Sequence, residues 1–396
     1  MTTDTTSPAV GVRSPRLPLA ALLALATAVF VTSLTETLPA GLLPAMSAGL
    51  GVGESAAGQA VTVYAVGTAL TAIPLAAAAS AWRRKRLLLT AMAGFAVANT
   101  VTAVSADYPL TMVARFVAGV AAGLAWALLA GYARGLAPAE LRGRAVAVVM
   151  TGIPVALSLG VPAGTYLGEL LGWRWEFALM TAVTAGLLGW IALLVPDRPG
   201  QQRTAREPVL RALAVPGVAP VLFVTLVFVL AHTVLYAYIA TFLDRYGMGG
   251  SAGAVLLVFG GASLVSIWYV GARIDRRLRA LSVAAVLLVA GAAAVLGLFA
   301  DVPVLVYVAA GLWGLGWGGV PTLLQTAAAE AGGPRADAAQ AMLVTLWNAA
   351  MAAGGVLGGV LLDRFGAGAF PWTVLMLMAP VLAVVAGARR HGFPAG

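Results

Sequence analysis

Charged side chains are scarce in this sequence: they make up 10% of its 396 residues, while 61% of the residues are hydrophobic. About a quarter of the residues of a typical soluble domain are charged, so this composition excludes a water-soluble globular protein. A helix that crosses a hydrocarbon layer of about 30 Å needs about 20 apolar residues. The length therefore fits twelve membrane-spanning helices joined by short loops, and we expect the lipid bilayer as their environment.

Cysteine is absent, histidine occurs twice and lysine occurs once. Without thiols the chain cannot form disulfides, and two histidines, His232 and His391, do not suffice for the usual zinc site. Lys85 stands between two arginines, whereas a phosphate-binding loop needs a lysine after a glycine. A membrane enzyme would need a cluster of His, Asp or Glu at one membrane face, and the sequence has no such cluster. We therefore expect no enzyme, no metal, no cofactor and no ATP-driven motor.

Arginine supplies 23 of the 24 basic residues, and its distribution predicts topology rather than nucleic-acid binding. If the N-terminus lies inside, 20 basic residues fall in cytoplasmic segments and Arg115 lies within a span. Only Arg174, Arg245 and Arg364 then fall outside. The positive-inside rule thus predicts a multi-pass protein of the bacterial inner membrane with both termini in the cytoplasm.

Twelve apolar runs follow one another at nearly regular spacing. Their predicted bounds are 19–46, 56–81, 87–105, 110–136, 145–171, 177–195, 218–243, 252–272, 281–300, 304–329, 338–362 and 370–388. The predicted fold is all-α, with two pseudo-symmetric six-helix bundles at 18–195 and 218–388, a cytoplasmic linker at 196–217, and cytoplasmic tails at 1–17 and 389–396. An arginine-rich turn follows the second span of each half, which is typical of duplicated transporter halves with the substrate site between them.

Motifs in the first, fourth and fifth spans follow the order and spacing of one transporter family. They are TETLPAGLLPAMSAGLGV at 35–52, the series Arg115, Gly119 and Gly123, the row Gly160, Pro162, Gly164 and Gly168, and GWRWEF from Gly172. In these features the chain resembles the major facilitator superfamily, in particular its twelve-span drug and metabolite efflux branch. The resemblance implies the major facilitator fold, a small-molecule substrate, proton antiport and a monomer.

The family's loop motif after the second span is matched in only one half of the chain. Gly271, Asp275 and Arg276 fit it in the second half, whereas Ala76 and Ser80 replace its glycine and aspartate in the first. Asp275 is either a latch near a helix N-terminus of the other half, closing the cytoplasmic side, or a solvated charge beside arginines. The first half has no matching carboxylate.

Glu36 and Arg115 are the charged residues expected inside the membrane. An ionised carboxylate facing lipid costs several kcal/mol, so Glu36 should face the bundle interior, on a helix face shared with Thr32, Thr35 and Pro39. It is either a proton site or a static carboxylate tied to an arginine. Its depth differs from that of Arg115 by only about 5 Å, so an ion pair is possible. The resemblance implicates this arginine in proton coupling; alternatively, the pair only locks two helices.

The predicted substrate site lies between the halves, near Trp126, His232, Tyr236 and Asn348. His232 lies near the midplane and could accept a proton or bind substrate, although a lone histidine often only joins helices. Trp126 is either an aromatic wall or a packing residue. Asn348 is either a cavity residue or a polar contact between helices.

The fifth span should be bent and closely packed, because a row of glycines and Pro162 share it. Its Gly160, Gly164 and Gly168 serve either gating or plain packing.

These features together predict a secondary transporter that exports a small organic molecule, a drug, sugar or metabolite, in exchange for protons. Its two halves would rock about the substrate site, and the proton gradient would be the energy source. The scarcity of acid favours a neutral or weakly charged amphiphile as substrate. The alternatives are a proton-coupled importer or a uniporter, and, in another class, a membrane receptor or enzyme.

Overall fold

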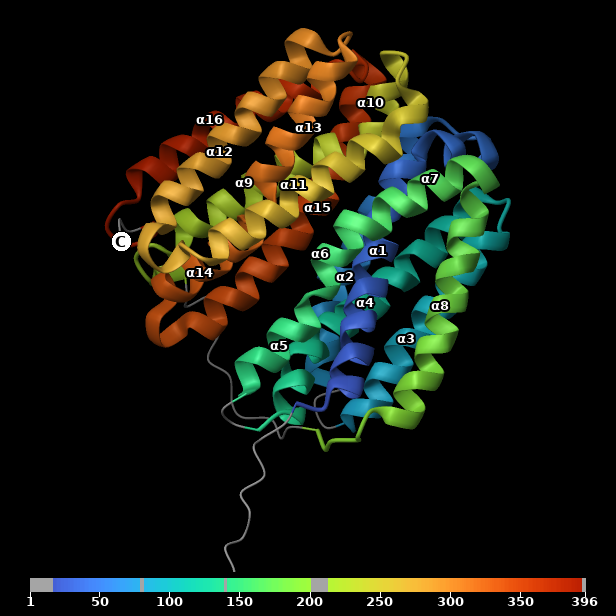
Figure 1. The fold of residues 1–396 in the computed structure, drawn as a ribbon, viewed down its shortest axis with the longest axis vertical. Coiled ribbons are helices and arrows are strands. Elements are labelled where there is room, and N and C mark those ends of the chain that lie inside the picture. The colour runs from blue at the N-terminus through green and yellow to red at the C-terminus, as the bar shows by residue number, and fades with distance from the viewer. Residues whose placement is uncertain (1–16, 79–81, 139–140, 201–212, 394–396) are drawn as a thin grey trace, which may run out of the picture.

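The computed structural model describes residues 17–78, 82–138, 141–200 and 213–393, in which every regular element is a helix. The first half contains α1 (Leu19–Leu50), α2 (Glu54–Ala78), α3 (Arg84–Val104), α4 (Tyr108–Leu136), α5 (Arg142–Met150), α6 (Gly152–Val155), the π-helix η2 (Ala156–Gly160), α7 (Val161–Leu171) and α8 (Trp173–Leu194). The second half contains α9 (Val218–Tyr236), α10 (Ile239–Arg245), η4 (Gly249–Ser251), α11 (Ala252–Gly271), α12 (Ile274–Phe299), α13 (Pro303–Trp317), α14 (Val320–Gly332), η5 (Gly333–Arg335), α15 (Ala336–Phe365) and α16 (Ala369–Gly387). Figure 1 shows the two halves as two bundles side by side.

The predicted spans are confirmed as helices. Eleven helical stretches in the described residues are long and apolar enough to cross a membrane. The predicted span 56–81 corresponds to α2, which has 25 residues and packs between α4 and α15. The first span is longer than predicted and ends where Gly51 adopts a left-handed φ of 65°. Most of the predicted N-terminal tail and residues 201–212 of the predicted linker lie outside the described residues.

Three spans are interrupted, and the interruption of the fifth has a local chemical reason. In the fifth span Pro162 has no N–H for the carbonyl of Ser158, and the preceding turn widens to the π-helix η2. The helix is therefore irregular where the bend was predicted, and the bend itself stays a prediction. The tenth span breaks at Gly318 and Gly319, where the Gly319 N–H donates to the Ser266 hydroxyl at 3.1 Å. The seventh breaks between α9 and α10. Broken helices of this kind line substrate sites in many transporters.

Close helix contacts repeat at equivalent places in the two halves. In the first half, Gly119 of α4 lies against the backbone of Tyr64 in α2, and the Thr68 hydroxyl donates to the Gly119 carbonyl at 3.0 Å. In the second half, Gly314 of α13 lies against α11, and the Ser263 hydroxyl donates to the Gly314 carbonyl at 3.2 Å. The two bonds have the same sequence offset. This agrees with the internal symmetry predicted from the arginine-rich turns.

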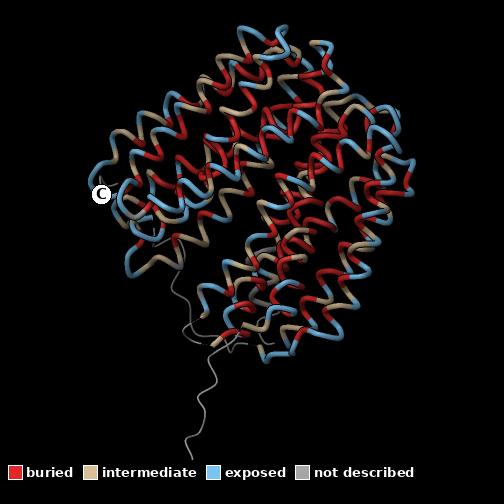
Figure 2. The backbone as a smooth tube through the Cα atoms, viewed as in Figure 1, coloured by how far each residue is buried: buried red, intermediate tan, exposed pale blue. Residues whose placement is uncertain are grey.

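The two halves meet along α2 and α15, and along α7 with η2 and α11. The bundles converge near the last residues of α1 and α15, whereas α5 and α14 diverge at the opposite, arginine-rich end (Figure 1). Buried backbone concentrates inside each bundle and along this meeting line (Figure 2). The helices of the two halves therefore lie closer together at one end than at the other (Figure 1).

Candidate functional site

A cavity of about 240 Å³ lies between the two halves. Its lining comes from α1, α2, α4 and the fifth span on one side, and from α9, α11, the end of α13, α14 and α15 on the other. The side chains used below are Ser33, Glu36, Thr37, Trp126, His232, Tyr236, Phe259, Trp317, Gln325, Trp347 and Asn348. All four residues of the predicted substrate site are therefore brought together in one cavity.

Glu36 faces this cavity together with Ser33 and Thr37. Thr32, Thr35 and Pro39, predicted to share a face with Glu36, are buried and do not line the cavity, so the predicted shared face is wrong for the cavity side of α1. Tyr64 donates to the Thr32 carbonyl at 3.1 Å and Asn99 donates to the Thr35 hydroxyl at 3.2 Å. A helix can carry polar residues on two different faces. The sequence spacing alone placed Glu36 and the two threonines on one face.

Arg115 is completely buried among α1, α2 and α4. Its Nη2 donates to the Thr35 carbonyl at 2.6 Å, and its guanidinium lies over the Tyr64 ring at 5.1 Å. The local sequence explains this contact: Pro39, four residues after Thr35, has no N–H to donate to that carbonyl. Arg115 therefore supplies the hydrogen bond that the proline removes.

Glu36 and Arg115 do not form the ion pair that the sequence allowed, because no nitrogen of Arg115 lies within 4.0 Å of a Glu36 oxygen. In the described part of the chain the buried Nη1 of Arg115 has no hydrogen-bond partner. A buried charge held by carbonyls and ring faces alone is costly. The Nη1 of Arg115 can thus still donate a hydrogen bond to an acceptor that moves toward it.

Replacing Pro39 by Ala tests the carbonyl contact. The alanine N–H would complete the helix and compete with Arg115 for the Thr35 carbonyl, so gradient-driven transport should fall several-fold. Pro44→Ala in the same helix is the matched control, because among the described residues no arginine donates to the Ala40 carbonyl that Pro44 frees. Equal transport by wild type and Pro39→Ala in proteoliposomes would contradict the role of the contact.

The cavity wall of the second half is aromatic. His232 is stacked on Trp317, with ring centroids 3.4 Å apart and planes 3° apart, and it also contacts Tyr236 and Phe259. The sequence analysis did not include Trp317, Trp347 or Phe259 in the site. The helical spacing of Trp313 and Trp317 was the available signal, because residues four apart share a helix face.

Comparison with known proteins agrees with this geometry. The family model described as Major Facilitator Superfamily matches residues 25–338. The chain belongs to the Major Facilitator Superfamily. It is therefore a multi-pass membrane transporter and not an enzyme, as the sequence predicted.

Two curated relatives and one solved structure resemble this superfamily member over most of its length. A protein of Pseudomonas aeruginosa named transcription regulatory protein OpdE is 30% identical, with 95% of each chain covered. A chloramphenicol efflux pump of Mycobacterium tuberculosis is 31% identical, with 86% of this chain and 85% of the pump covered. The nucleoside transporter NupG superposes with a TM-score of 0.75 at 12% identity. The superposition covers 93% of this chain and 98% of NupG, so the two proteins share the fold.

In this superfamily member the glycine row of the fifth span faces α1 and the buried Glu176, not the cavity. A Cβ on Gly160 would meet Phe30 and Leu34, and one on Gly164 would meet Leu38 and the Glu176 carboxylate. The packing interpretation of Gly160, Gly164 and Gly168 therefore describes their contacts, and their predicted part in gating stays a prediction. Glu176 is 4% exposed and was missed by the sequence analysis.

A hydrogen-bonded group, here called the outer clasp, closes the converging end of the superfamily fold. The Tyr238 hydroxyl donates to the Gly355 carbonyl at 2.9 Å, while Gln59 of the other half donates to the Tyr238 hydroxyl at 3.4 Å. The Ser158 hydroxyl donates across the halves to the Gly260 carbonyl at 2.9 Å. The bond from Gln59 to Tyr238 and the bond from Ser158 to Gly260 cross between the two bundles, whereas the bond from Tyr238 to Gly355 lies within the second half.

Removing the Tyr238 hydroxyl should loosen the outer clasp. Each such hydrogen bond contributes about 1 kcal/mol, so Tyr238→Phe should raise the population open at this end about fivefold or more. Because the chain lacks cysteine, spin labels can be attached at Gly53→Cys in the first half and Gly250→Cys in the second. Pulsed electron paramagnetic resonance then measures the distance between the two labels. Tyr132→Phe, which loses a bond within one half, should leave the distance unchanged. An unchanged distribution in Tyr238→Phe would rule out the clasp.

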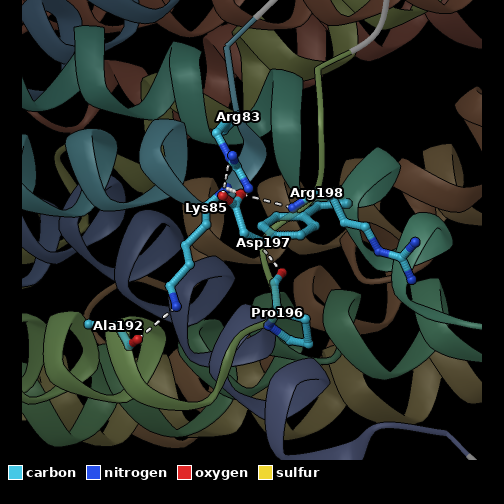
Figure 3. Close-up of polar contacts among 7 residues, drawn as sticks. Arg83, Lys85, Ala192, Pro196, Asp197 and Arg198 are labelled. Carbon is cyan, nitrogen blue, oxygen red and sulfur yellow. Dashed lines mark hydrogen bonds and ion pairs between the residues drawn. The ribbon is translucent and has the colours of Figure 1, made fainter.

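A carboxylate also lies at the arginine-rich loop of the first half, where the family's aspartate is missing. Asp197, just after α8, forms an ion pair with Arg83 and accepts from the Lys85 backbone N–H at the start of α3 (Figure 3). Burial raises the pKa of Asp197, but the hydrogen bonds from Arg83 and the backbone outweigh it and hold that pKa below its usual range. A negative charge at this helix N-terminus is stabilising.

The loop motif of the second half forms a turn between α11 and α12. Gly271 ends α11 and Arg276 is exposed at the start of α12, where its N–H donates to the Arg273 carbonyl. The side chain of Asp275 lies outside the described residues, as does Ser80. The predicted latch of Asp275 therefore stays a prediction.

Proposed function

We propose that this protein is a proton antiporter that exports small organic molecules from the bacterial cytoplasm. Glu36 is its proton site, Arg115 modulates that site, and the cavity between the halves binds the substrate. The protein works as a monomer and needs no cofactor, since the proton gradient supplies the energy. The similarity to a chloramphenicol efflux pump supports export.

The single observation that carries this proposal is the position of Glu36. Among the described residues that line the cavity, Glu36 alone carries a carboxyl or a cationic group. A carboxyl in a mostly apolar cavity is stable as a neutral acid, and it can ionise where water reaches it. Substrate and proton can therefore exclude each other at one site, which is the requirement for antiport.

The arginine distribution supports the direction of transport. It assigns the diverging end of the fold to the cytoplasm, so that this conformation would be open inward and closed by the outer clasp outside. A substrate would enter between α5 and α14, and reorientation of the halves would release it on the other side.

Everted vesicles of an efflux-deficient bacterium test the proposal. An acid interior is generated, and chloramphenicol and a panel of aromatic compounds are added in turn. A transported compound should accumulate inside, dissipate the pH difference, and leave when a protonophore is added. Compounds that equilibrate without any response to the pH difference would indicate a uniporter, and compounds expelled by it would indicate an importer.

A further inference from the structure

His232 occupies a defined place in the aromatic wall of the cavity. It lies on α9, it is 8% exposed, and its ring lies flat against Trp317. The indole Nε1 of Trp313 is 3.1 Å from the Nδ1 of His232. Trp313 itself is 1% exposed and stands behind the wall, on α13. One face and one nitrogen of the imidazole are thus fixed by two tryptophans.

The chemistry of this hydrogen bond determines where the imidazole carries its proton. An indole N–H can only donate, so the Nδ1 of His232 must accept and carries no hydrogen. A doubly protonated imidazole has no acceptor nitrogen. The ring is therefore neutral, with its single N–H on Nε2.

The Nε2–H is directed to the cavity rather than to the protein. In the described part of the chain the Nε2 of His232 has no hydrogen-bond partner. It is also not among the fully buried nitrogens without a partner, so this atom is accessible. His232 lines the cavity together with the half-buried Trp126 and Trp347, one from each half. The cavity lining thus combines a fixed donor with two partly exposed indoles.

We propose that the substrate is a planar aromatic or heteroaromatic molecule whose ring nitrogen or carbonyl oxygen accepts a hydrogen bond from Nε2 of His232. The inference rests on the proposed function, because it takes the cavity as the transport site. Aromatic rings stack favourably on indoles, and a site that donates a hydrogen bond discriminates against analogues without an acceptor. His232 thereby selects the substrate and does not carry the transported proton, and Trp313 is a positioning residue for it.

Quinoline and naphthalene test the proposal, because they share one shape and only quinoline has an acceptor nitrogen. Their equilibrium affinities are measured on the full chain in nanodiscs without a pH gradient, with empty nanodiscs subtracted. His232→Phe keeps a planar ring and removes the donor. The ratio of quinoline affinity to naphthalene affinity should fall about tenfold in this variant, the usual size of one hydrogen bond in a binding site. His391→Gln, at the exposed end of the chain, should leave the ratio unchanged.

A second measurement keeps the proposal testable if His232→Phe does not fold. The chain has two histidines, so labelling histidine with ¹⁵N gives two imidazole signals, and His391→Gln assigns them. Two-bond proton–nitrogen correlations should show the Nε2–H tautomer for His232 at pH 7, and a mixture of tautomers in Trp313→Phe.

Three results would overturn the proposal: an unchanged affinity ratio in His232→Phe, no binding of either probe, or a His232 ring protonated on Nδ1. None of these measurements depends on a gradient or on Glu36. If proton antiport is disproved, these binding and tautomer measurements still test the role of His232. If they disprove that role, gradient-driven transport by Glu36 is still possible.

Discussion

Glu36→Gln should abolish accumulation of substrate against its gradient while preserving exchange of substrate across the membrane. Glutamine resembles a protonated glutamate in shape but has no proton to release. One proton exchanged per substrate supplies about 1.4 kcal/mol for each pH unit, which corresponds to about tenfold accumulation. In everted vesicles with a difference of about two pH units, the accumulation ratio should fall from about 100 to about 1.

The control for this prediction is Glu169→Gln. Glu169 is an exposed residue of α7 that does not line the cavity, so its loss should leave accumulation as in the wild type. Substrate exchange without a gradient, measured on the same vesicles, shows that Glu36→Gln is folded and inserted. Full gradient-driven accumulation in Glu36→Gln would remove Glu36 as the proton site and leave Glu176 as the buried acid to consider next.

The architecture was predictable because few physical rules govern it. In a bilayer each apolar run of about 20 residues must form a helix, since unpaired backbone groups in hydrocarbon cost several kcal/mol. Run length, arginine position and the two arginine-rich turns therefore sufficed for twelve helices in two halves. The irregular turn of the fifth span lies just before Pro162, where the missing N–H leads one to expect it.

The details of the site were less predictable, because they depend on which faces of different helices meet. Trp126, His232, Tyr236 and Asn348 were identified by depth and type, and they do line one cavity. The partner of Arg115, the Thr35 carbonyl, was not predicted. Only carboxylates were considered as partners, and this partner is a backbone carbonyl that Pro39 leaves without a donor. Asp197 was missed for a different reason: it contacts the arginine-rich loop in space but lies 114 residues beyond Arg83 in the sequence.

The packing of α4 on α2 leads to the second large effect. A Cβ at Gly119 would overlap the backbone carbonyl of Tyr64, which, unlike a side chain, cannot rotate away. Gly119→Val must therefore separate the two helices, which breaks the bond from Thr68 to the Gly119 carbonyl and displaces Arg115 one turn away. Overpacking of this kind typically costs about 1–3 kcal/mol, and a clash with backbone belongs at the upper end or above it.

Gly131→Val in the same helix is the matched control, because nothing lies within 4 Å of a Cβ at that exposed position. Gly119→Val should aggregate on extraction or unfold several degrees lower in a thermal assay in detergent, whereas Gly131→Val should behave as the wild type. Gly314→Val should repeat the defect, because Gly314 meets the Phe259 carbonyl in the second half as Gly119 meets Tyr64 in the first. Equal thermal stability of all three variants would mean that α2 and α4, and likewise α11 and α13, are not packed this closely. If only the two close-contact variants lose stability, both halves depend on the same glycine contact, as expected of a duplicated bundle.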